Sequence, residues 1–143
     1  MRIGEVLDSK SRGDVVTIRP DAGVRELLAA LATHNIGALV VSADGASLDG
    51  IVSERDVVRR LHADGTVVDT TVGAIMTALV ETCSPETDLD DLMRTMTDRR
   101  IRHVPVVDDG RLVGIVSIGD VVRAKIGRLE FERDQLDSYL HQG

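Results

Sequence analysis

The chain contains the same ten-residue pattern twice. Residues 50–59 read GIVSERDVVR and residues 114–123 read GIVSIGDVVR. Upstream of these segments, further residues of the first copy match residues 65 positions later in the chain. At Gly50 and Gly114 the separation is 64 positions, because the first copy has one extra residue in its turn. Almost the whole of the 143-residue chain is therefore two copies of one unit.

A unit of about 60 residues buries only about 60% of the surface of its unfolded chain and is marginally stable alone. We therefore expect the two copies to pack together as one globule. Hydrophobic residues make up 43% of the chain, but it has one Phe, one Tyr and no Trp. The core must therefore be aliphatic, and aromatic platforms for stacking nucleic-acid bases are nearly absent.

The composition also limits the partners and the compartment. A net charge of −7 argues against a nucleic-acid partner, which needs a basic face. No window approaches 18 uninterrupted apolar residues, so we expect no membrane span. The single cysteine, Cys83, cannot form an intrachain disulfide, and the N-terminus shows no targeting pattern. These features predict a reduced, cytoplasmic protein.

The hydrophobic period changes in the same order within each copy. In the first copy, residues 15–18 are expected to form a strand, and Asp21 can cap a helix with apolar residues at 24, 27, 28 and 31. Residues 38–41 and 48–52 are expected to form two further strands on either side of a turn at 44–45. In the second, a strand is expected within 79–85, a helix over 89–96, and strands at 103–107 and 112–116. A final helix begins near Glu54 or Ile118. The expected fold is α+β, with each unit β-α-β-β-α after a short helical segment.

The order of elements, the G-h-V-S-x-x-D-h-h signature and the duplication resemble a tandem pair of cystathionine-β-synthase (CBS) domains over about residues 1–126. The resemblance implies two pseudo-symmetric repeats packed through their sheets, with two clefts between them, and a homodimer. We divide the chain into repeat 1 (1–67), repeat 2 (70–127) and a C-terminal amphipathic helix (128–143).

The repeated signature predicts a ligand site on physical grounds as well. A strand that passes directly into a helix leaves the first amides of that helix unpaired, with a partial positive charge that favours an anion. Ser53 and Ser117 stand at the cap position, and Asp56 and Asp120 follow three residues later, where a carboxylate can accept both hydroxyls of a ribose. The alternative is a capping box, in which the aspartate only returns a hydrogen bond to the cap amide.

The resemblance also assigns residues to two unequal clefts. In the Asp120 cleft, adenine would lie near Gly13, Asp14 and Val15, the nucleoside near Ile36, Gly37 and Ala38, and phosphate near Arg102 and His103, beside the junction residues Ser117, Ile118 and Gly119. The Asp56 cleft would use Ser53, Arg55, Thr77, Ala78 and Ile101. The extra segment 9–12 brings Lys10 and Arg12 near the Asp120 cleft, where a larger ligand such as a dinucleotide could use their charge.

The C-terminal segment continues a helical pattern with apolar residues at 126, 129, 136 and 140. It could close a cleft or pair with its twin across a dimer. Its acidic polar face argues against attachment to a membrane surface.

The sequence shows no catalytic or metal-binding pattern. Its four histidines lack metal-ligand spacing, and neither a nucleophile elbow nor a glycine-rich phosphate loop is present. Together with the resemblance to CBS pairs, this leads us to expect a regulatory module, not an enzyme, that binds AMP, ADP, ATP, NAD or S-adenosylmethionine and acts on an unidentified protein. The alternative is a dimerising adaptor with vestigial clefts that acts through a protein partner.

Overall fold

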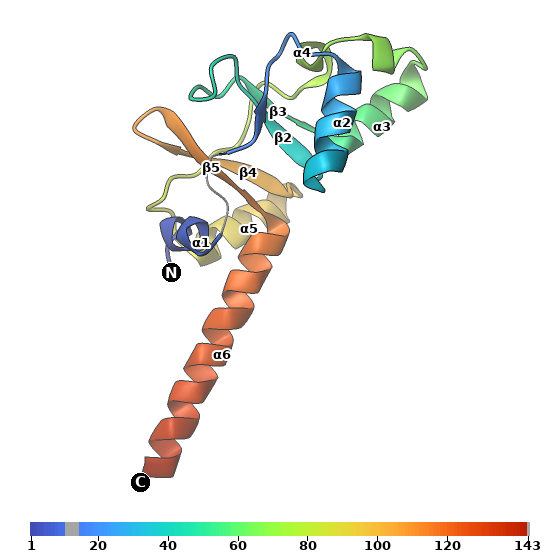
Figure 1. The fold of residues 1–143 in the computed structure, drawn as a ribbon. Coiled ribbons are helices and arrows are strands. Elements are labelled where there is room, and N and C mark those ends of the chain that lie inside the picture. Colours follow the sequence, from blue (N-terminus) through green and yellow to red (C-terminus); the bar gives the residue numbers. More distant parts are fainter. Residues whose placement is uncertain (11–14, 143) are drawn as a thin grey trace.

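The computed structural model describes residues 1–10 and 15–142 (Figure 1). The first half of the chain forms α1 (Ile3–Ser9), β1 (Thr17–Ile18), α2 (Val24–His34), β2 (Ala38–Val41), β3 (Gly50–Ser53) and α3 (Glu54–Ala63). A 3-10 turn, η1 (Val67–Asp69), leads to the second half. That half forms α4 (Val72–Ile75), α5 (Leu89–Arg99), β4 (His103–Asp108), β5 (Arg111–Ser117) and α6 (Ile118–Gln142). The two halves follow the same order of elements, with one exception in the second sheet.

That exception is the first strand of the second repeat. The first sheet has the order β1-β2-β3, with β1 parallel and β3 antiparallel to β2, whereas the second contains only the antiparallel pair β4-β5. The strand expected within 79–85 is reduced to one parallel bridge between Cys83 and Val106. Leu79 is 96% exposed and cannot belong to a buried strand. Pro85 has no amide hydrogen to extend the pairing.

The two central helices begin differently. Asp21 was expected to cap α2, but the cap residue is Gly23, and Asp21 instead pairs with Arg19 at 3.1 Å. In the second repeat Asp88 caps α5 by accepting hydrogen bonds from two backbone amides of the first turn. The first repeat therefore lacks the side-chain cap that the second has.

Each short N-terminal helix packs on the other repeat. One hydrophobic core contains residues of β1, β2, β3, α2 and α3 together with Val72 and Ile75 of α4. The other contains residues of α5, β4, β5 and α6 together with Ile3 and Val6 of α1. The short helix that opens repeat 1 in sequence thus completes the core of repeat 2, and the short helix that opens repeat 2 completes the core of repeat 1.

Matching backbone hydrogen bonds hold this exchange at both places. Gly4 donates to the carbonyl of Pro85 at 2.9 Å, and Gly73 donates to the carbonyl of Pro20 at 2.8 Å. A side chain at Gly73 would approach the Pro20 carbonyl oxygen to 3.0 Å, which explains the small residue there. Because helices of this length are unstable alone, their burial on the opposite repeat is what orders them. The exchange also brings the end of α1 to the junction of β5 with α6.

Helix α6 continues well past the second repeat. Figure 1 shows its red C-terminal part running away from both sheets. Val121, in its first turns, is fully buried in the second core, but every residue from 126 to 141 is exposed. Within residues 1–10 and 15–142, no helix has the length and apolar character needed to cross a bilayer.

Candidate functional site

The junctions of β3 with α3 and of β5 with α6 form the same local structure. The Asp120 amide donates to Ser117 Oγ at 3.1 Å, and the Ser117 amide donates back to Asp120 Oδ2 at 2.9 Å. Ser53 and Asp56 make the same pair of bonds, at 3.3 and 2.8 Å. Both motifs are therefore capping boxes in this structure, and each aspartate is held at the first turn of its helix with acceptor capacity left over.

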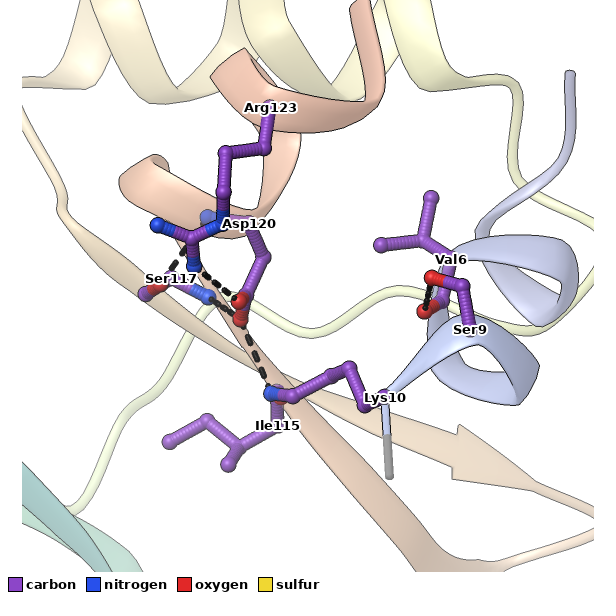
Figure 2. Close-up of polar contacts among 7 residues, drawn as sticks. All are labelled: Val6, Ser9, Lys10, Ile115, Ser117, Asp120 and Arg123. Atoms are coloured by element: carbon purple, nitrogen blue, oxygen red, sulfur yellow. Dashed lines mark hydrogen bonds and ion pairs between the residues drawn. The ribbon is translucent and has the colours of Figure 1, made fainter. Parts of the chain in front are cut away.

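The two aspartates differ in the cations around them. Lys10 Nζ donates to Asp120 Oδ2 at 2.8 Å and to the carbonyl of Ile115 at 2.9 Å. Arg123 approaches the other oxygen, Oδ1, at 2.9 Å, so that the carboxylate lies between two basic side chains (Figure 2). Asp56 forms no ion pair within the described residues.

The end of α1 places Lys10 at this position. Ser9 Oγ donates to the carbonyl of Val6 at 2.7 Å, and the Lys10 amide donates to Leu7 at 3.1 Å, so the helix ends there in an extended residue. Figure 2 shows the Lys10 side chain reaching from this end toward Asp120. Lys10 lies in the segment present only in the first copy, so the second copy offers no equivalent lysine.

These contacts set the charge of Asp120. Burial alone would raise the pKa of its carboxyl, but the hydrogen bond and charge of Lys10, together with the Ser117 amide, outweigh burial and hold the pKa below its ordinary value of 3.8. Asp120 is therefore an anion at neutral pH. An ionised carboxylate accepts about four hydrogen bonds, and three acceptor positions are occupied here.

Asp120 lies in a cavity of about 1010 Å³ between the two repeats. Seven of the residues predicted for this cleft line it: Val15, Ile36, Gly37, Ala38, His103, Ser117 and Asp120. They come from the segment before β1, the residues that lead into and begin β2, the start of β4 and the junction of β5 with α6. The structure therefore brings together in one cavity residues that lie more than 100 positions apart in sequence.

His103 lies in this cavity as a half-buried side chain. Burial lowers the pKa of its imidazole below 6.5, against the opposing charges of Asp120 and Glu54, which raise it. The neutral imidazole is therefore the main form at neutral pH. It can donate one hydrogen bond to an anion but does not supply a full positive charge.

Among the described residues, three others predicted for this cleft are absent from the cavity wall: Arg102, Ile118 and Gly119. Gly13 and Asp14 lie outside the described residues. Arg102 is exposed and contributes its carbonyl, which accepts the Ile118 amide at 2.8 Å. Gly119 lies beside the cavity, where an added side chain would contact Arg123 at 3.5 Å.

Two walls of the cavity were not assigned from the sequence. One comes from α1 and includes Val6 and Leu7, which the exchange of the short helices brings here. The other is the face of α6 one, two and three turns beyond Asp120, formed by Ala124, Gly127 and Phe131. Helical spacing from Asp120 would have indicated the second wall, whereas no local signal indicates the first.

The residues predicted for the Asp56 cleft have other surroundings. Thr77 exchanges two backbone hydrogen bonds with Ile51, at 2.9 and 3.0 Å, which ties the start of the second unit to β3. Arg55 and Ala78 are exposed, and Ile101 packs against the second core. A ligand site around Asp56 stays a prediction.

Comparison with known proteins places these observations in a family. A profile of the CBS domain matches twice, at residues 3–63 and 72–127. The chain belongs to the CBS domain family. Both matches include the serine and aspartate of the capping motif, at Ser53 and Asp56 and at Ser117 and Asp120.

Individual CBS proteins are similar along nearly the whole chain. The mitochondrial CBS domain-containing protein CBSX3 of Arabidopsis thaliana is 39% identical over 99% of this chain and 72% of its own length. The crystal structure of a CBS-domain protein from Agrobacterium tumefaciens is 42% identical, with a TM-score of 0.82 over 87% of this chain and 99% of that one.

Two similar structures contain ligands. The structure of CBSX2 in complex with AMP is 29% identical, with a TM-score of 0.74 over 88% of this chain and 96% of that one. The CBS domain pair of protein MJ0100, in complex with 5′-methylthioadenosine and S-adenosyl-L-methionine, is 29% identical, with a TM-score of 0.77 over 90% and 98%.

Proposed function

We propose that this chain is a non-catalytic regulatory module that binds an adenosine-containing ligand in the Asp120 cavity. The observation that carries the proposal is an ionised carboxylate, fixed by a capping box, on the wall of a cavity formed by both repeats. Carboxylate oxygens in such a position can accept the two hydroxyls of a ribose. The AMP and S-adenosylmethionine complexes of the similar CBS proteins support this class of ligand.

The charges of the cavity favour a phosphorylated ligand. Lys10, Arg123 and Arg128 line it with positive charge, and Asp120 supplies one negative charge. The amides at the start of α6 add partial positive charge on the same side. A nucleotide such as AMP, ADP, ATP or NAD therefore fits this cavity better than the sulfonium cation of S-adenosylmethionine.

Binding of the ribose requires a rearrangement around Asp120. Two hydroxyls need two acceptor positions, and about one remains free. The Arg123 side chain is 74% exposed, whereas that of Lys10 is 27% exposed. Arg123 is therefore the cation that moves, and it becomes available to the ligand phosphate.

The proposed readout is a change in a homodimer that an unidentified partner protein detects. Occupancy can shift the conformation only if the ligand binds one state more tightly than the other. Helix α6 is suited to transmit such a difference because it carries Asp120 at its start and extends to the exposed end of the chain. We propose a reduced, cytoplasmic setting, consistent with a single free cysteine.

Calorimetric titration with AMP, ATP, NAD and S-adenosylmethionine tests the proposal. We expect micromolar binding of a nucleotide, about −8 kcal/mol. Asp120→Ala should weaken it about 10- to 150-fold, because hydrogen bonds to a charged group are worth about 1.5–3 kcal/mol. Asp56→Ala is the matched comparison for loss of a cap because it removes the same capping aspartate from the other repeat, and it tests the predicted Asp56 cleft separately.

Two results would contradict the proposal. Equal weakening by both variants, with unfolding temperatures lowered equally, would mean that the aspartates act only as caps. Absence of binding by all four ligands, checked by thermal shift, would favour the adaptor, in which the clefts are vestigial and a protein partner docks on the module.

A further inference from the structure

Helix α6 carries an exposed apolar seam that follows a coiled-coil spacing. Its members are 41–65% exposed: Val122, Ile126, Leu129, Leu136 and Leu140. Successive members are four, three, seven and four positions apart in the sequence. Arg133 occupies the position that divides the step of seven into steps of four and three. Alternating steps of four and three place all six positions on one face of a helix, as the core positions of a heptad repeat are placed.

Apart from Val122, the seam lies on a part of the helix that is exposed along its whole described length. Every residue from 126 to 141 is exposed, and Figure 1 shows this part projecting beyond both sheets. An isolated helical segment of this length is marginal in water. The cavity residues Asp120, Ala124 and Gly127 follow the opposite face, so the seam is not the wall of the nucleotide site.

The charges along α6 identify the partner and its direction. Residues 121–129 carry three basic side chains and no acidic one, whereas residues 130–137 carry four acidic side chains and one basic. In an antiparallel pair centred on residue 131, the basic segment 121–129 faces residues 133–141 of the second copy, which include Asp134 and Asp137, and only the short segment 130–132 faces its own counterpart. A parallel copy would place acidic against acidic and would put Arg133 directly opposite the partner's Arg133.

The spacing also fixes one antiparallel register. With the two-fold axis beside residue 131, Val122 faces the partner's Leu140 and Ile126 faces the partner's Leu136. Leu129 then faces the partner's Arg133, whose charged end can reach the acidic residues at the edge of the seam. All six positions of each helix are paired with none left over.

We propose that two copies of this chain associate through an antiparallel pairing of their α6 helices in this register. The pairing does not depend on a nucleotide, so it is tested on the ligand-free protein. Its failure would leave the proposed ligand site unaffected.

Light scattering after size-exclusion chromatography gives the first test. We expect the wild-type chain to be a dimer and Leu129→Glu to be a monomer at the same concentration. The matched control is Leu61→Glu on α3, because Leu61 and Leu129 are both 51% exposed. A monomeric wild type, a dimeric Leu129→Glu, or dissociation by Leu61→Glu alone would overturn the proposal.

Disulfide crosslinking tests the direction and register. In a Cys83→Ser background, Ile126→Cys mixed with Leu136→Cys should form a crosslinked dimer on oxidation, and neither variant alone should do so. Crosslinking of each variant with itself would indicate a parallel pair, and absence of crosslinking in the mixture would exclude the register. Either result would overturn the arrangement proposed here.

Discussion

The contact between Lys10 and Asp120 predicts a specific loss of stability when the lysine is neutralised. Lys10→Met keeps the length and apolar stem of the side chain but removes its charge and donors. The Nζ atom lies 2.8 Å from Asp120 Oδ2, and the two side chains are 27% and 11% exposed, so solvent screens this pair only partly. A hydrogen bond to a charged group contributes about 1.5–3 kcal/mol, which predicts a loss of about 2 kcal/mol.

Arg123 provides the matched control on the same carboxylate. Its Nη2 atom lies 2.9 Å from Oδ1, but its side chain is 74% exposed. Exposed ion pairs contribute about 0.2–1 kcal/mol, so Arg123→Met should cost less than about 1 kcal/mol. The difference between the variants therefore measures how much burial contributes to the Lys10 contact.

Urea unfolding at one protein concentration is the assay, because self-association makes the stability depend on concentration. With a slope of about 1–3 kcal/mol per molar urea, Lys10→Met should lower the midpoint by roughly 1 M. A double-mutant cycle with Asp120→Asn isolates the pairwise free energy. The reasoning is refuted if Lys10→Met costs no more than Arg123→Met.

The pH dependence of this loss has a defined sign. The folded-state pKa of Asp120 lies below the ordinary 3.8. The stability from its ionised form is therefore complete above about pH 4 and is lost as the pH falls through the folded-state pKa. The difference between wild type and Lys10→Met should accordingly be largest at neutral pH and shrink progressively as the pH falls below about 4.

Two further predictions concern packing and reactivity. Gly50→Ala should lower the free energy of unfolding by about 1–3 kcal/mol, because the added carbon would lie 2.6 Å from the backbone oxygen of Thr77. Gly114→Ala should lower it less, because the added carbon would lie 2.7 Å from a methyl of Leu7, which can move. Equal losses in urea unfolding would contradict this. The Cys83 thiol should react with iodoacetamide at pH 8 about 100-fold more slowly in the folded chain than in urea. The reason is that burial raises the pKa of the thiol from 9.0 to about 11, which lowers the reactive thiolate fraction. Similar rates would show that the thiol is accessible.

Local patterns predicted most elements correctly, and at both serine–aspartate motifs the structure shows the capping box that was the alternative to a ligand role. The strand at 38–41 and the helices after Ser53 and Ser117 depend on neighbouring residues, and the structure confirms them. The prediction for 79–85 was wrong because pairing with β4 is limited to one bridge at Cys83, since Pro85 has no amide hydrogen to extend it and Leu79 is exposed. The cap at Asp21 was wrong because the helix begins two residues later than that pattern suggested.

The repeat in the sequence was sufficient to determine the family, the approximate order of elements and the two equivalent aspartates, because these follow from local periodicity and from comparing one copy with the other. The sequence did not determine which repeat receives each short helix. That choice depends on long-range burial of apolar faces, and it places α1 on the second core. The extra segment in the first copy indicated that Lys10 lies near the Asp120 cleft, but only the tertiary structure showed its direct contact with the Asp120 carboxylate and the exposure of the far half of α6.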